Sequence, residues 1–351
     1  MKIMLGKQSV QFENPPMILS AAAVTGPKEG QGPLGACFDR VWEDELCGAK
    51  SWEKAESLLQ EQALQLALQK KKLPMSSLRY LLAGDLINQI TPSHFAARDT
   101  QVPFLGIYGA CSTMGLGLSL GAMLVAGGYA DCLAAEASSH YCTSEKQFRT
   151  PLGYGSQRPL YATWTVTGCG AVILGRAPAA AQPGDVFVTG ATNGKIVDYG
   201  IKDAFNMGGA MAPAAAEVIK AHFRDFQRTP RDYDGIFTGD LGYYGSELLY
   251  ELLEEEDLYI RGKHRDCGCL IFDKEEQDTH GGGSGCGCSA VTLAGYLIKE
   301  LQQGRMKRIL FIPTGALLSP LSTQQGESIP CVAHAVVLES VGKGEMIHGV
   351  S

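Results

Sequence analysis

Two apolar segments around residue 111 give the clearest structural prediction. Residues 102–108 form a short apolar run with β-branched and aromatic side chains, which is typical of a buried strand. Residues 114–125 carry no charge and no proline, and this pattern predicts a helix that is buried on all sides. We therefore expect Cys111 to lie on a glycine-bounded turn that joins a strand to a buried helix.

Upstream, the apolar pattern changes to a helical period. Residues 52–72 carry one apolar stripe, which predicts an amphipathic helix with Ser51 as its N-cap and Pro74 beyond its end. The stripe consists of Ala55, Leu58, Leu59, Ala63, Leu66 and Ala67. Residues 80–83 then predict a strand, which is followed by Gly-Asp-Leu.

The second half of the chain repeats this order. A helical stretch at 214–226 is followed by a proline, a predicted strand at 235–238 and again Gly-Asp-Leu. Eleven residues separate Pro74 from Asp85 in the first half, and ten separate Pro230 from Asp240 in the second.

The segment after the glycine-bounded turn has a counterpart as well. Cys111 precedes Ser138 by 27 residues, and Cys288 precedes Gly315 by 27 residues. Each interval contains an apolar helix, a glycine and a strand, and each half closes with an apolar strand, at 170–174 and 333–338. We interpret the chain as a tandem duplication of one α/β unit, with an N-terminal half at 1–178 and a C-terminal half at 185–351.

Alternating strands and helices predict an α/β fold with mainly parallel sheets. Two copies that face each other would place Cys111 and Cys288 at equivalent points and their helices between two sheets, which gives five layers. Ligands in such sheets bind beyond the carboxyl ends of the strands, where these turns lie.

Composition and charge narrow the class of protein. The 351 residues are 45% hydrophobic and 19% charged, which is ordinary for a globular chain, and the net charge of −7 argues against nucleic-acid binding. Eleven cysteines without a secretory signal indicate reduced thiols. We expect no signal peptide, because the apolar part of the N-terminus is too short, and no segment is typical of a membrane span.

Cys111 is the first candidate for chemistry. The free N–H groups and the dipole at the start of the following helix favour a thiolate or a bound anion there. The alternative is a plain buried thiol, since free cysteine is among the most buried residue types. The pairs at 267–269 and 286–288 have the spacing C-x-C, which is not the usual spacing of a zinc site, and we predict no metal.

A duplicated α/β unit with a cysteine on this turn resembles the thiolase and ketoacyl synthase superfamily. Longer motifs over nearly the whole chain resemble those of the stage V sporulation protein AD family. These motifs lie at 26–29, 84–86, 104–112, 138–140, 147–149, 211–216, 282–290, 314–320 and 328–331.

The resemblance implies a thiolase-like fold, with two duplicated halves in an αβαβα arrangement. It also implies a role in spore-forming bacteria, in which the family is implicated in moving dipicolinic acid into the developing spore and out at germination. Its members are thought to bind dipicolinic acid directly. We accordingly expect a peripheral protein of the spore inner membrane, held by other proteins of the transport assembly, and no cofactor. Relatives of this fold often pair through sheet edges, so a homodimer is a further expectation.

The resemblance also implies that the catalytic set is incomplete. Condensing enzymes use a cysteine with two groups from the second half, usually a histidine with an asparagine or a second histidine. Carried across by position, Cys111 keeps the nucleophile, Asp240 stands where the histidine is expected, and Ser284 where the asparagine is expected. His280 is a possible substitute or a solvated loop residue, and His334 reads as a core residue. We therefore predict binding without catalysis.

Dipicolinate is a flat ring with two carboxylates, so its site should offer N–H groups, hydroxyls and cations. The predicted ligand-binding residues are Cys111, Asp85, Ser138, Ser139, His140, Arg149, Lys202, Asp240 and Ser284. Arg149 and Lys202 are the candidate cations, with ordinary surface charges as the alternative. Asp85 and Asp240 either reach a calcium ion chelated by the ligand or cap backbone amides. The rival functions are an active acyltransferase that uses Cys111 and a purely structural scaffold.

Overall fold

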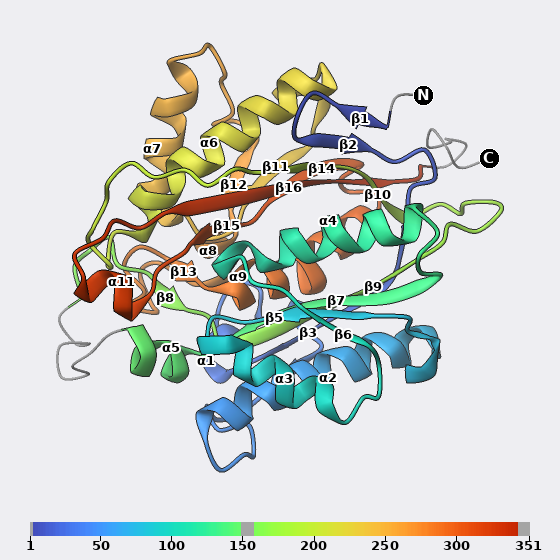
Figure 1. The fold of residues 1–351 in the computed structure, drawn as a ribbon, viewed down its shortest axis with the longest axis horizontal. Coiled ribbons are helices and arrows are strands. Elements are labelled where there is room, and N and C mark those ends of the chain that lie inside the picture. Colours follow the sequence, from blue (N-terminus) through green and yellow to red (C-terminus); the bar gives the residue numbers. More distant parts are fainter. Residues whose placement is uncertain (1–2, 149–157, 343–351) are drawn as a thin grey trace.

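The computed structural model describes residues 3–148 and 158–342, and Figure 1 shows alternating layers of helices and sheets. Two outer helices cover each sheet, and a third layer of helices lies between the sheets, which confirms the predicted five-layer α/β arrangement. The outer helices are α2 (Trp52–Lys71) and α3 (Thr91–Arg98) on one side and α6 (Met207–Phe226) and α7 (Gly242–Glu254) on the other; the inner ones are α4 (Thr113–Ala126), α9 (Cys286–Thr292) and α10 (Ile298–Gln302); the short helices are α1 (Pro27–Gly30), α5 (Tyr141–Phe148), α8 (Cys267–Ile271) and α11 (Pro320–Gln324).

Each half contributes five main strands in the same order. The strands of the first half run β6-β5-β7-β9-β3 and those of the second run β12-β11-β14-β16-β10. Their bounds are β3 (Met17–Thr25), β5 (Leu81–Gly84), β6 (Phe104–Gly106), β7 (Cys132–Ser139), β9 (Gly168–Gly175), β10 (Val186–Asn193), β11 (Gly235–Thr238), β12 (His264–Asp266), β14 (Arg308–Ile312) and β16 (Cys331–Ser340). The repeat read from the sequence is thus visible in the order of the strands, while the exact limits of the halves stay a prediction.

Short strands connect these two sheets and extend them. β10 pairs with β3, which joins the two sheets edge to edge, and β2 of the first half pairs with β10 of the second. The short strands are β1 (Met4–Leu5), β2 (Ser9–Gln11), β4 (Arg40–Val41), β8 (Trp164–Thr165), β13 (Gly283–Ser284) and β15 (Thr314–Ala316). β8 and β13 pair with each other as a separate two-stranded sheet that contains one strand from each half.

The prediction of mainly parallel sheets is wrong. In the first half β5 runs parallel to β6 and β7, but β9 runs antiparallel to β7 and β3. The second half has the same mixture. The reason lies in the connection after β7: the chain leaves β7 at Ser139 and re-enters the sheet at Gly168, directly opposite, so β9 has to run back.

The predicted helices are present with small shifts at their ends. The Ser51 hydroxyl accepts a hydrogen bond from the Lys54 amide and caps α2, as expected. No side chain of α4 is exposed, which agrees with a helix buried on all sides. α6 begins at Met207, seven residues before the predicted start, because Asn206 caps it through the Gly209 amide.

Two expectations around the turns need correction. The strand predicted at 102–108 is present as β6 but is not buried, because it is the edge of the sheet and pairs only with β5; Leu105 is 39% exposed. Cys111 lies in a short turn before α4, whereas Cys288 is the third residue of α9, so the two cysteines are not at strictly equivalent points.

Candidate functional site

Cys111 lies where the sequence places it, on a tight turn that leads into α4. The turn is a single 3₁₀ turn over Ala110–Ser112, and Cys111 is buried within it. Ala110 adopts φ +48°, a left-handed conformation that is uncommon for a residue with a side chain. Its carbonyl oxygen accepts the Thr113 hydroxyl at 2.6 Å and the Cys286 thiol at 2.9 Å. Contacts from both halves thus hold a strained turn in place, as is common at functional sites.

Asp240 is the centre of the polar contacts around this turn. It follows β11, is fully buried, and accepts the Ser284 hydroxyl at 2.9 Å and the Gly285 amide at 3.0 Å on Oδ2. Its Oδ1 accepts the Thr314 hydroxyl at 2.9 Å, and the carboxylate is near enough to the Cys111 thiol for each group to shift the pKa of the other. The structure therefore brings together Cys111, Asp240 and Ser284 from the predicted set. Thr314 also belongs to this cluster. Its position just after β14, at the start of the motif at 314–320, is the feature of the sequence that could have indicated it.

The electrostatics of this cluster oppose a thiolate. Burial is the main cause that raises the pKa of the Cys111 thiol well above its usual value, and the nearby Asp240 raises it further. Burial also raises the pKa of Asp240 to about 6, against an ordinary 3.8, so this carboxyl is ionised at neutral pH. The expectation that the α4 dipole yields a thiolate is therefore not met, because burial and an adjacent negative charge outweigh the dipole.

Residues 138–140 divide between different surroundings, and none of them hydrogen-bonds to Cys111. Ser138 and Ser139 are adjacent in β7, so their side chains point to opposite faces of the sheet. The Ser138 hydroxyl donates to Glu56 at 3.0 Å and accepts from Gln60 at 2.7 Å, on the α2 side. The Ser139 hydroxyl donates to the Val166 carbonyl at 2.6 Å and accepts the Gly287 amide at 3.0 Å, on the inner side.

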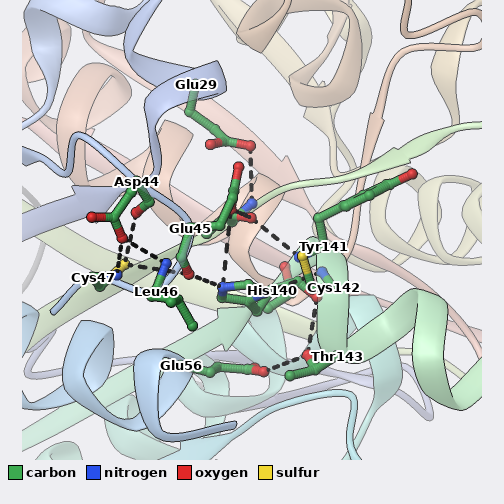
Figure 2. Close-up of polar contacts among 12 residues, drawn as sticks. Glu29, Asp44, Glu45, Leu46, Cys47, Glu56, His140, Tyr141, Cys142 and Thr143 are labelled. Carbon is green, nitrogen blue, oxygen red and sulfur yellow. Dashed lines mark hydrogen bonds and ion pairs between the residues drawn. The ribbon is translucent and has the colours of Figure 1, made fainter. Parts of the chain in front are cut away.

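His140 faces a loop before α2 instead. Figure 2 shows its ring beside Glu45, whose carbonyl oxygen lies 2.7 Å from Nε2. Nδ1 accepts the Cys142 amide at 3.1 Å, and burial lowers the pKa of the imidazole. His140 therefore has a structural partner at each ring nitrogen. Ligand binding by Ser138, Ser139 or His140 stays a prediction.

Asp85 takes the capping alternative that the sequence left open. Its carboxylate accepts the Ile87 amide at 2.8 Å and both the amide and the hydroxyl of Ser93, at 3.0 and 2.6 Å. Burial raises its pKa to about 6. Its counterpart Asp240 also accepts a backbone amide, and it lies near the Cys111 thiol as well.

Of the two candidate cations, only Lys202 can be placed, and it does not join the cluster. Arg149 lies outside the described residues, and Lys202 is exposed on the loop between β10 and α6. His280 lies at the protein surface, with Nδ1 3.0 Å from the Pro159 carbonyl and Nε2 3.0 Å from Asp278. His334 is buried in β16, in agreement with its interpretation as a core residue, and burial lowers its pKa to about 4.

A buried polar cluster around Glu56 was missed by the sequence analysis. Glu56 and Gln60, one helical turn apart on α2, are fully buried with Ser138, and Thr143 donates to Glu56 at 2.8 Å (Figure 2). The sequence could have indicated this cluster, because Glu56 and Gln60 lie next to the apolar stripe of α2. Within 3–148 and 158–342, no three histidine, cysteine or acidic residues are arranged to hold a metal ion, and no helix is long and apolar enough to cross a membrane.

The sequence matches a known protein family over nearly its whole length. The family model described as Stage V sporulation protein AD matches residues 6–339. A relative of that name from Bacillus subtilis (strain 168) is 47% identical over 337 residues, which cover 96% of this chain and 98% of that one.

Solved structures with a similar fold are condensing and thiolytic enzymes. Human mitochondrial 3-ketoacyl-CoA thiolase, solved in complex with CoA, has a TM-score of 0.58 at 12% identity and covers 95% of this chain and 99% of its own. The 3-oxoacyl-[acyl-carrier-protein] synthase III of Aquifex aeolicus VF5 has a TM-score of 0.55 at 13% identity, over 92% and 99%. At such low identity these likenesses establish the shared fold and nothing about the chemistry.

Proposed function

The chain belongs to the stage V sporulation protein AD family and has a role in sporulation, and from this premise we propose that it binds dipicolinic acid without catalysing a reaction. The binding would support uptake of dipicolinic acid into the developing spore and its release at germination, within a transport assembly at the spore inner membrane. The protein would be held there peripherally by partner proteins.

The observation that carries the non-catalytic part is a buried carboxylate, Asp240, whose charge acts on the buried Cys111 thiol. A thiolase-type nucleophile needs a neighbour that accepts its proton or stabilises its negative charge, and imidazole does both. Asp240 is an anion at neutral pH and lies near the thiol, so it favours the protonated, unreactive form of Cys111. Ser284 donates its hydrogen bond to Asp240 and is thereby occupied.

The rival function is acyl transfer through Cys111. It is favoured by the retained cysteine at the start of α4 and by the fold shared with thiolase and synthase III. Incubation with acetyl-CoA followed by mass spectrometry of the Cys111 peptide separates the two functions. We expect no acylation of Cys111; stoichiometric acylation followed by turnover would overturn the proposal.

Ligand binding has its own test. Titration calorimetry with dipicolinate, with and without calcium, should show saturable binding by the purified protein. Picolinate, which has one carboxylate less, is the matched control and should bind more weakly. Absence of heat under both conditions would remove dipicolinic acid as the ligand.

A further inference from the structure

Two cations share one aromatic ring at the surface end of the β8–β13 pair. The ammonium of Lys28 lies 4.3 Å from the centre of the Trp164 ring, and the guanidinium carbon of Arg158 lies 4.9 Å from it. The Tyr141 ring stacks on Trp164 at 3.8 Å with an interplanar angle of 3°. Because Tyr141 occupies one face of the indole, the two cations share the other.

These two positive charges are only partly neutralised. Nη2 of Arg158 donates to the carbonyl and the carboxylate of Asp278, at 3.1 and 2.9 Å, and Nζ of Lys28 donates to the Gln277 carbonyl at 2.6 Å. The Arg158 side chain is only 8% exposed, yet its buried Nη1 has no hydrogen-bond partner among the described residues. A buried guanidinium N–H without an acceptor is costly, and a ligand oxygen would satisfy it.

The acid next to Lys28 does not supply this missing charge. Glu29 is fully buried, and burial raises its pKa to about 8, so its carboxyl is mostly protonated at pH 7. Its Oε1 accepts the Thr167 amide at 2.9 Å. Burial is the main cause that lowers the pKa of Lys28; Glu29, when ionised, and Asp278 raise it, and the neighbouring Arg158 lowers it. An anion bound between the two cations would offset their mutual repulsion and favour the charged form of Lys28.

A cleft lies beyond Asp278, the acid that pairs with Arg158. It has a volume of about 830 Å³ and is lined by Asp278, His280 and Lys274 and by the acids Glu247, Asp266 and Glu275, but not by Lys28, Arg158 or Trp164. Asp278, which pairs with Arg158, has a 74% exposed side chain and can give way to an incoming anion. Asp278 therefore stands between the cation pair and this cleft.

We propose that Lys28 and Arg158, with Trp164 beneath them, form a binding site for a carboxylate group. On the proposed function, on which this step rests, the carboxylate is one of the two carried by dipicolinate. The site is also connected to the Cys111 cluster: Trp164 and Thr165 in β8 pair with Gly283 and Ser284 in β13, and Ser284 donates to Asp240. A ligand on Trp164 would thus lie next to Thr165, which pairs with Ser284 of the buried polar cluster.

Calorimetric titration with dipicolinate tests the assignment. K28Q and R158Q should each bind roughly 10- to 100-fold more weakly than the unmodified protein, the range expected for the loss of one charge-assisted hydrogen bond. R40Q is the matched control, because Arg40 stacks on Trp42 at 3.9 Å in a similar cation–π pair elsewhere. Thermal melts identify any variant that does not fold, and R158K, which keeps the charge, should lose less affinity than R158Q.

A fluorescence experiment separates failure of the site from failure of the function. In a W42F/W52F protein the emission comes from Trp164, the remaining one of three tryptophans, and acetate should change it in a saturable way. If dipicolinate binds equally to the unmodified protein, K28Q and R158Q, the site is wrong and the proposed function stands. If dipicolinate gives no heat but acetate changes Trp164 emission, and R158Q abolishes the change, the function fails and the site stands. No response to acetate, or a tighter response to inorganic phosphate, would overturn the carboxylate assignment.

Discussion

Replacement of Asp240 by asparagine should make Cys111 more acidic. Two unit charges about 4 Å apart interact by ~4 kcal/mol at the effective dielectric of ~20 that suits protein sites. An interaction of this size is large compared with the about 1.4 kcal/mol that corresponds to one pKa unit, so removal of the Asp240 charge should lower the pKa of the Cys111 thiol. Burial, the larger cause of the raised pKa, remains in D240N, so the thiol should still titrate above its ordinary range.

The geometry suits an asparagine at this position. Its carbonyl oxygen can replace Oδ2, which accepts from Ser284 and Gly285. Its NH₂ group would then face the Thr314 hydroxyl, which can reverse its role and accept. The substitution thereby removes the charge and keeps the contacts.

The assay is the pH–rate profile of iodoacetamide alkylation at Cys111, followed by mass spectrometry. Restricted access to a buried thiol scales the rate at every pH but leaves the midpoint unchanged, so the midpoint reports the pKa. D266N is the control, because Asp266 is a buried acid that bonds to Thr238, Leu241 and Gly242. An unmodified protein whose Cys111 titrates near or below its ordinary range, or a D240N midpoint equal to that of D266N, would refute the reasoning.

Two further substitutions test a buried acid, Glu136, and the turn at Gly285. Burial raises the pKa of Glu136 to about 8, against an ordinary 4.5, so the folded chain keeps a proton that the unfolded chain releases, and stability falls by about 1.4 kcal/mol per pH unit between those values. E136Q should therefore match the unmodified protein in urea denaturation at pH 4.5 and be several kcal/mol more stable at pH 8. The exposed-site control E251Q should leave the pH dependence of stability unchanged. If E136Q and the unmodified protein lose stability equally with rising pH, the assignment of the raised pKa to Glu136 is wrong. Gly285 has φ +98°, and an added Cβ would lie 2.6 Å from the Ser139 hydroxyl. G285A should therefore lower the free energy of unfolding by ~1–3 kcal/mol in the same assay. An unchanged free energy of unfolding would show that the turn before α9 can relax.

Periodicity and spacing predicted most of the fold. The 27-residue intervals after Cys111 and Cys288 implied a repeated unit, and the strands of the two halves do follow one order. Strand direction could not be obtained in this way, because it depends on where a connection re-enters the sheet. The return of the chain at Gly168, opposite Ser139, is a tertiary fact that no local pattern encodes.

The site was predictable where it follows strand ends of the repeat. Asp240 was placed by its position in the repeat and in the family pattern, and Ser284 by the family pattern alone; both lie in the Cys111 cluster. The alternation of side chains along a strand could have separated Ser138 from Ser139 in advance. By contrast, the partner of His140 is 95 residues away, at Glu45, and such contacts between loops leave no periodic signal.

The exchange of edge strands between the halves has a consequence for any attempt to divide the chain. β2 hydrogen-bonds to β10, and β10 hydrogen-bonds to β3, although β9 and β10 are joined only by the connection 176–185. Proteolytic nicking of that connection would yield two fragments that copurify and melt together. Either fragment expressed by itself would present an unsatisfied strand edge and should aggregate until its complement is added.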